Sequence, residues 1–212
     1  NKLSDLKNHL KDIDPEAQDL PVFLADNHDK NSLDCITSVT RVIISTVGPY
    51  IKYGKKLVES CASNRTDYCD LTGEVPFIRE SIDSYNAIAK ENNCRIIHSC
   101  GFDSIPSDIG VLILQKEAIK RCGKPFNRVR LYARSMKGGL SGGTIASMIK
   151  ISDYVRSKPE FSGLLGNPYA LNPDPQIFKG VDEPRLRSVK WDEDMNLWIY
   201  PFIMSGINTR IV

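Results

Sequence analysis

Short runs rich in β-branched and aromatic residues alternate with longer stretches of helical periodicity through the first 122 residues of this chain. The strand-like runs are residues 41–46, 66–71 and 95–99, and the helix-like stretches are residues 54–63, 76–92 and 106–121. Strands that alternate with helices of about 10–15 residues are typical of βαβ units, which form parallel sheets. The alternation predicts an α/β fold with a Rossmann-like parallel sheet in residues 1–122, including a buried strand at residues 41–46.

The first forty residues add elements of the same kind. Apolar side chains recur at helical spacing from Leu3 to Ile13, and Pro15 ends the pattern. Residues 20–26 form an apolar run that stops at a polar cluster, which predicts a strand. Residues 32–39 predict a short helix.

The pattern changes after Gly123. Residues 126–136 alternate between apolar residues and arginine, as expected for a half-buried strand of an antiparallel sheet. A helix is predicted from residue 144 to 155. We therefore expect residues 123–212 to be part of a second, mixed α+β domain that serves substrate binding or dimerisation.

The last third of the chain is interrupted by prolines. Residues 157–188 contain five of them and are predicted to be rich in loops. Residues 197–204 are apolar and strand-like, and we expect the chain to stop at Val212 inside a strand.

Composition excludes several classes of protein. The net charge is +2, so the chain has no general basic field for nucleic acid. There is no run of ~18 apolar residues that would predict a spanning helix. The 6 cysteines include no Cys-x-x-Cys pair, and the 3 histidines show no metal spacing, so we predict reduced thiols and no metal site. His98 is expected in the core or in a cleft.

Polar and glycine-rich clusters follow the predicted strands, and they are the candidate site. In an open parallel sheet, ligands bind outside the carboxyl ends of the strands. The candidates for binding a cofactor are Asp26, Thr46, Val47, Gly48, Pro49, Tyr50, Gly101, Phe102 and Asp103. The candidates for binding a substrate are Glu74, Ser104, Gly142, Gly143 and Thr144.

Each candidate also has a structural interpretation. Asp26 could bond a ribose or begin an Asx turn. Tyr50 could stack on a ring, donate a proton or pack against a neighbour. Glu74 could hold a substrate amine or orient a loop. Asp103 and Ser104 could act in the site or cap the helix that follows. The glycine run at residues 138–143 offers N–H groups for an anion, or is a flexible connection to a helix.

The order and spacing of these motifs resemble the saccharopine dehydrogenase-like oxidoreductases over essentially the whole chain. The matching segments are Val47 to Tyr50, Tyr68 to Glu74, Gly101 to Asp108 and Pro201 to Met204. The run from Ser141 to Thr144 resembles the trans-acting enoyl reductase branch of that family. The resemblance implies a Rossmann domain that binds NAD or NADP, and a second domain that supplies most of the substrate pocket.

One expected feature of that family is missing from the sequence. No glycine-rich dinucleotide fingerprint occurs before Pro15. We therefore interpret the chain as partial, lacking the first βαβ unit. The pyrophosphate cradle, and the residue that separates NAD from NADP, would lie in that unit.

The resemblance implies hydride transfer between a nicotinamide and a small or lipid-linked substrate, with Tyr50 and Asp103 as the candidate catalytic residues. Three alternatives stay open: a non-catalytic protein that binds a nucleotide or a lipid surface, a trans-acting enoyl reductase-like activity, and a strict saccharopine-forming enzyme. The expected setting is a reducing one, in the cytoplasm or at an organelle or lipid-droplet surface. Peripheral membrane contact and a homodimer are further expectations.

Overall fold

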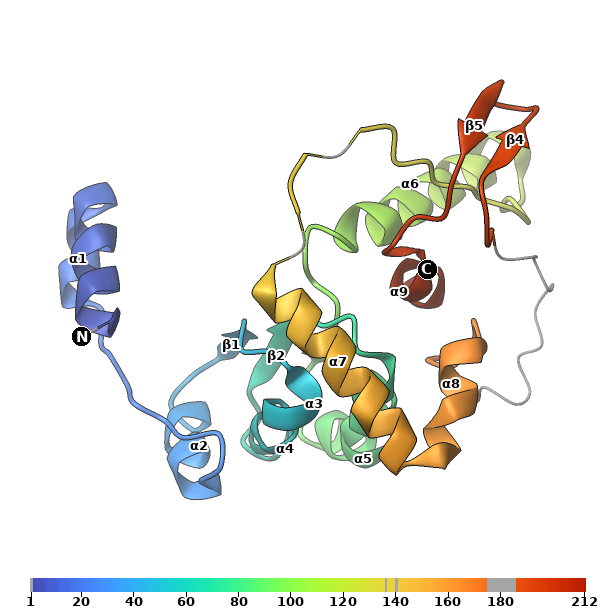
Figure 1. The fold of residues 1–212 in the computed structure, drawn as a ribbon. Helices are drawn as coiled ribbons and strands as arrows, with labels where there is room; N and C mark the ends of the chain where they lie inside the picture. Colours follow the sequence, from blue (N-terminus) through green and yellow to red (C-terminus); the bar gives the residue numbers. More distant parts are fainter. Residues whose placement is uncertain (1, 136, 140, 175–185) are drawn as a thin grey trace.

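The computed structural model describes residues 2–135, 137–139, 141–174 and 186–212. It confirms a mixed α/β architecture (Figure 1). The elements of the first part are α1 (Lys2–Ile13), η1 (Pro15–Asp19), α2 (Lys30–Thr37), β1 (Val42–Ser45), α3 (Tyr50–Tyr53), α4 (Lys55–Ser63), β2 (Asp67–Asp70), α5 (Val75–Glu91), β3 (Ile96–Ile97) and α6 (Ile105–Cys122). Those of the second part are α7 (Gly142–Ser157), η2 (Pro159–Phe161), α8 (Ser162–Gly166), β4 (Lys190–Asp192), β5 (Leu197–Ile199) and α9 (Ser205–Ile211).

The three strands of the first part form a parallel sheet in the order β1-β2-β3, as the alternation predicts. Val42 pairs with Asp67 and Ser45 with Asp70, so the strands end at nearly the same level. The two long helices α5 and α6 begin with Pro76 and Pro106 in their first turns, where the missing N–H costs nothing. The carboxyl ends of all three strands therefore meet at one edge of the sheet.

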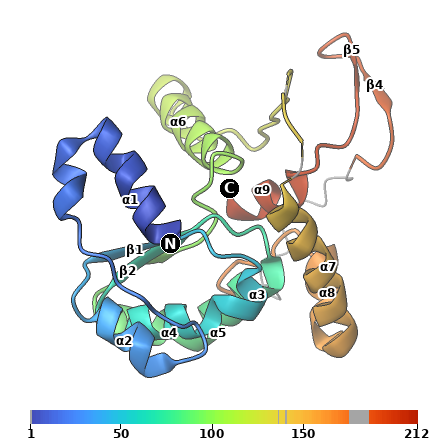
Figure 2. The ribbon, with the colours of Figure 1, turned by 60° about the vertical axis from the view of Figure 1, so that its left-hand side comes forward.

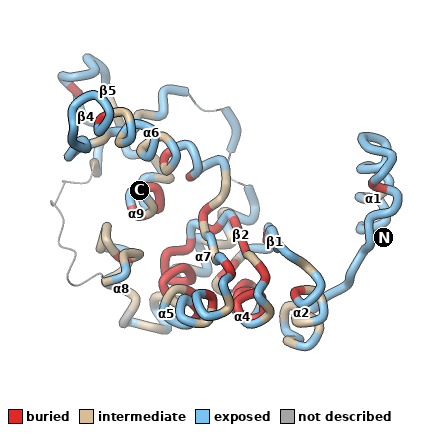
Figure 3. Tube along the Cα trace, turned by 180° about the vertical axis from the view of Figure 1, so that it is seen from behind, coloured by how far each residue is buried: buried red, intermediate tan, exposed pale blue. Residues whose placement is uncertain are grey.

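One face of this sheet carries the core. Helices α4 and α5 pack on that face, and the buried residues gather there (Figure 3). In Figure 2, α2, α4 and α5 lie on one side of the strands, and α1 and α6 lie on the other. Burying apolar side chains between sheet and helices supplies most of the driving force for this part.

The other face of the sheet is open. Val42 is 48% exposed and Ile44 is 72% exposed, so the prediction of a fully buried strand is wrong for β1. The physical reason is that α1 and α6 stand away from this face in the described structure, and a strand buries only the side chains that a neighbouring layer covers.

Two predicted strands are not formed in the described residues. Residues 20–26 and residues 126–135 have no regular secondary structure and no partner strand; residue 136 lies outside the description. An apolar run becomes a strand only where a second chain segment pairs with its backbone N–H and C=O groups. Leu24 is 79% exposed, so its side chain lies mostly in solvent.

The end of the chain also differs from the prediction. The strand at residues 197–204 is limited to β5, which pairs in antiparallel fashion with β4 and stacks Trp198 edge-on against Trp191. The chain does not stop inside a strand, because residues 205–211 form α9. Ile207, Asn208 and Arg210 are buried, so one face of this helix packs on the rest of the molecule.

The predicted helices are confirmed. The helix of residues 144–155 corresponds to α7, and those of residues 3–13, 32–39, 76–92 and 106–121 correspond to α1, α2, α5 and α6. None of the helices within the described residues is both long enough and apolar enough to cross a membrane.

All six cysteines are free thiols, and they differ in exposure. Burial, with a smaller contribution from Cys94, raises the pKa of Cys61 to about 12, whereas Cys35 and Cys122 are exposed. Since the thiolate is the reacting form, we expect iodoacetamide near pH ~8 to modify Cys35 and Cys122 at least ~100-fold faster than Cys61. Mass spectrometry of the native protein checks this. Modification of Cys61 at the rate of Cys35, without unfolding, would contradict the buried position.

Candidate functional site

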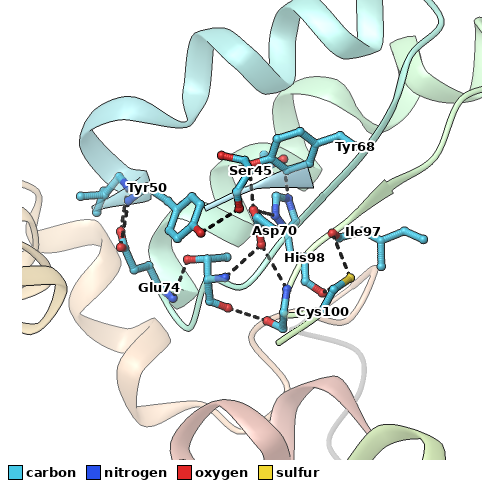
Figure 4. Close-up of polar contacts among 12 residues, drawn as sticks. Ser45, Tyr50, Tyr68, Asp70, Glu74, Ile97, His98 and Cys100 are labelled. Carbon is cyan, nitrogen blue, oxygen red and sulfur yellow. Dashed lines mark hydrogen bonds and ion pairs between the residues drawn. The ribbon is translucent and has the colours of Figure 1, made fainter. Parts of the chain in front are cut away.

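The loops that follow β1, β2 and β3 come together at the carboxyl edge of the sheet. Two buried carboxylates, Glu74 and Asp70, hold these loops in place (Figure 4). Figure 4 shows Tyr50 and Glu74 on one side of the group, Asp70 and His98 next to each other in the middle, and Cys100 on the other side. The predicted convergence of the strand ends on one edge is therefore observed.

Glu74 receives protein donors on both of its oxygens. Its Oε1 accepts from the backbone N–H of Tyr50 (2.9 Å) and from the hydroxyl of Ser147 (2.7 Å), and its Oε2 accepts from the N–H of Ile51 (2.7 Å). The residue is 1% exposed. Glu74 thus binds the first turn of α3, where a negative charge is favourable. Because the residue is buried, a substrate could reach its carboxylate only if the surrounding groups moved.

Tyr50 is buried at the start of α3. Its hydroxyl donates to the carbonyl of Ser45 (3.0 Å), and its ring stacks on Phe77. Burial, the largest cause, together with the carboxylates of Asp70 and Glu74, raises the pKa of Tyr50 to about 12. The phenol therefore stays protonated at neutral pH. To donate a proton to a substrate, it would have to leave Ser45.

Asp70, at the end of β2, lies at the centre of a buried polar network. Four groups contact its carboxylate: the hydroxyl of Tyr68 (2.9 Å), Nδ1 of His98 (2.7 Å), and the N–H groups of Thr72 (3.0 Å) and Ser99 (3.2 Å). The other ring nitrogen of His98 lies 2.9 Å from the hydroxyl of Ser81. Burial is the main cause that raises the pKa of Tyr68. The network joins the loops after β2 and β3.

The loop after β3 is closely packed at Gly101 and exposed at its tip. A Cβ atom on Gly101 would lie 2.4 Å from Oδ1 of Asp103 and 3.1 Å from Cβ of Leu71, so a side chain there would require Asp103 to turn away and Leu71 to shift slightly. Phe102 is 91% exposed and Asp103 is exposed. These two residues form the solvent-facing rim of the site.

Ser104 occupies the N-cap position of α6, but its side chain does not cap the helix. Its hydroxyl donates to Oδ1 of Asn208 (2.9 Å), and the Asn208 amide donates to the carbonyl of Asp103 (2.9 Å) and to the hydroxyl of Ser107 (3.0 Å). Ser104 is 2% exposed. The second part of the chain therefore fixes the third loop through α9.

The structure brings Asp26 and Val47 to one open pocket of about 300 Å³. Asp26 also forms the Asx turn that the sequence offered as one alternative, because its Oδ1 accepts from the N–H of His28 (2.8 Å). The ring of Tyr53 completes the pocket and meets His28 edge-on. The remaining residues of the first loop, Thr46, Gly48 and Pro49, continue from this pocket toward α3, and the Gly48–Pro49 peptide is cis.

Helix α7 passes beside the first loop and α3. Ser141 caps it, accepting from the N–H of Thr144 (3.2 Å), so Gly142 and Gly143 form its exposed first turn. A Cβ atom on Gly48 would lie 3.8 Å from the hydroxyl oxygen of Ser147. The second turn of α7 therefore lies near the first loop, and the substrate roles of Gly142, Gly143 and Thr144 stay predictions.

Sequence reasoning did not single out two side chains that organise this site, and it did not find the partner of a third, His98. Asn208 and Ser147 come from the second part of the chain. Asn208 bonds to Ser107, which is 101 positions away, and Ser147 bonds to Glu74, which is 73 positions away, so no local sequence pattern connects them. His98 was expected in the core or a cleft, and the alternation of side chains along its strand gave no hint of the partner on β2.

Three known proteins similar to this chain are all named trans-acting enoyl reductases. A provisionally named trans-acting enoyl reductase of Mycobacterium tuberculosis is 40% identical over 201 residues, which cover 92% of this chain and 48% of that protein. Trans-acting enoyl reductases of Mycobacterium leprae and Mycobacterium bovis are 35% and 37% identical, covering 98% and 94% of this chain and 51% and 49% of their own lengths. The chain is homologous to these proteins and spans about half their length.

No family model and no solved structure matches the chain.

Proposed function

We propose that this chain is part of an NAD(P)-dependent oxidoreductase of the saccharopine dehydrogenase-like kind that reduces the carbon–carbon double bond of an enoyl substrate. The single observation that carries the proposal is the homology to trans-acting enoyl reductases over more than nine-tenths of the chain. The parallel sheet, with its loops gathered at one carboxyl edge, supports it, since dinucleotides bind at such edges.

The described residues fit the nicotinamide end of such a cofactor. Val47 is 51% exposed and Phe102 is 91% exposed, so two loops present apolar side chains to solvent at the same edge. Asp26 adds a carboxylate to the pocket that Val47 lines. When bound, NAD(P)H supplies the hydride, and the protein supplies position and electrostatics.

Each loop at the carboxyl edge would then have a separate role. Val47 and Gly48 would lie against the cofactor, and Phe102 would shield the site from water. Reduction of a double bond also takes a proton, for which Tyr50 and Asp103 remain the candidates. Tyr50 is protonated but bonded to Ser45, whereas Asp103 lies at the exposed rim.

Turnover by the full-length protein tests this proposal. We expect NADPH or NADH to be oxidised with a 2-enoyl thioester, and the saturated thioester to be detected by mass spectrometry. Tight cofactor binding without turnover of enoyl thioesters, ketones or imines would favour the non-catalytic alternative. Turnover with saccharopine alone would favour the saccharopine-forming alternative. The names of the relatives lend no support to the lipid-droplet association expected from the resemblance.

The substitution Val47→Glu tests where the cofactor lies. A carboxylate at this half-exposed position repels a dinucleotide, and we expect cofactor affinity to fall about tenfold, or ~1.4 kcal/mol, with little change in stability. The matched control is Val39→Glu, because Val39 is 68% exposed and precedes β1, at the opposite end of that strand. Fluorescence titration with NADPH measures both. Equal affinities for the two variants would remove the cofactor from the carboxyl edge.

A further inference from the structure

Helix α7 is held against α3 and α5 by polar contacts rather than by a buried apolar face. Within this helix no residue is classed as buried. Two hydroxyl groups make the contacts: Ser147 donates to Glu74 (2.7 Å), and Tyr154 donates to Oε2 of Glu80 (3.1 Å). The two residues are seven positions apart, so they lie two turns apart on the same face of the helix. Lys158 adds a longer contact to Glu80, at 3.9 Å.

The two carboxylates that accept these hydrogen bonds, Glu74 and Glu80, differ in their other partners. Glu80 is on the outer side of α5 and pairs with Lys55 (2.7 Å). Glu74 binds the N–H groups of Tyr50 and Ile51, which begin directly after the loop of residues 46–49. Its oxygen Oε1 serves both Tyr50 and Ser147, so one buried atom connects the first loop with α7.

We propose that Glu74 is a positioning residue that sets the distance between the first loop and α7, and thereby the distance between cofactor and substrate. The inference rests on the proposed function, in which the first loop faces the cofactor, and on the expectation that the second part of the chain, which includes α7, supplies most of the substrate pocket. Hydride transfer depends steeply on that distance, because a misplacement of ~1 Å can cost ~100-fold in rate. Glu74 itself need not touch either ligand.

The substitution Ser147→Ala separates this role from simple support of the helix. It removes the bond to α7 and leaves the bonds of Glu74 to Tyr50 and Ile51 intact. We expect the dissociation constant for NADPH to stay within about twofold, and kcat with the enoyl thioester to fall about tenfold or more. The control is Tyr154→Phe, which removes the other hydroxyl from the same face of α7. Its kcat should stay within about twofold of the wild type.

Amide hydrogen exchange provides a readout that does not depend on activity. In Glu74→Gln, we expect faster exchange both at Tyr50 and Ile51 and in the first two turns of α7, because both are bound by the same carboxylate. In Glu80→Gln, faster exchange should be confined to the C-terminal half of α7. The two variants exchange a carboxylate for an amide of equal size, so they are matched.

The outcomes are distinct. Equal losses of kcat in Ser147→Ala and Tyr154→Phe would mean that α7 needs only to be docked, and would overturn the inference. So would exchange in Glu74→Gln that rises at Tyr50 and Ile51 but not in α7. If the wild-type protein neither binds NADPH nor turns over, the proposed function fails, and the exchange pattern alone decides whether Glu74 couples the two segments.

Discussion

Replacement of Asp70 by asparagine is expected to lower the free energy of unfolding by about 3–4 kcal/mol. Asp70 is 1% exposed and its carboxylate is in contact with four groups, among them the Tyr68 hydroxyl and Nδ1 of His98. Asparagine keeps the volume but removes the negative charge, and its NH₂ group can replace Oδ2 only if the Tyr68 hydroxyl and Nδ1 of His98 both act as acceptors. Urea denaturation measures the change.

Tyr68→Phe is the control for this prediction. It removes one donor from the same network and should cost about 1 kcal/mol, because only one hydrogen bond is lost and its carboxylate partner keeps other donors. If Asp70→Asn fails to accumulate as folded protein, Tyr68→Phe still should. A loss below about 1 kcal/mol for Asp70→Asn would show that the buried network is not a main support of the loops after β2 and β3.

Arg79→Met is expected to cost about 2–4 kcal/mol. Arg79 is 6% exposed, and it donates to the carbonyls of Ala170 (3.3 Å) and Asn172 (2.9 Å). Methionine fills the space of the aliphatic stem but leaves these carbonyl groups without the guanidinium. We expect the segment of residues 167–172 to detach from α5 and to be cut faster by proteases. Chemical denaturation and limited proteolysis measure both effects.

The partner of Arg79 on its own helix gives the control. Asp83 forms an ion pair with Arg79, but its side chain is 63% exposed. Asparagine keeps one oxygen that accepts from the guanidinium, and the carboxylate that it replaces is exposed, so Asp83→Asn should cost only about 1 kcal/mol. Equal losses in Arg79→Met and Asp83→Asn would indicate that the ion pair, and not the bonds to the carbonyl groups, carries the stabilisation.

The sequence predicted the local structure of this chain well where the cause is local. Helical spacing of apolar residues predicted α5, and prolines in the first turns marked where α5 and α6 begin. A short β-branched run predicted β1. Because parallel strands end at one edge, the sequence also predicted that Tyr50, Glu74 and Gly101 would gather there. It failed at residues 20–26 and 126–135, since an apolar run does not reveal whether a partner strand is present.

Only the tertiary structure decided what the polar residues do. Glu74 could be read as a substrate ligand until the donors from Tyr50, Ile51 and Ser147 were seen on its oxygens. The sequence determines which groups each segment carries and which way the local backbone turns. A buried carboxylate, in contrast, takes its role from the donors that the fold brings to it from distant segments, because burial without such partners would cost more than the fold could offset.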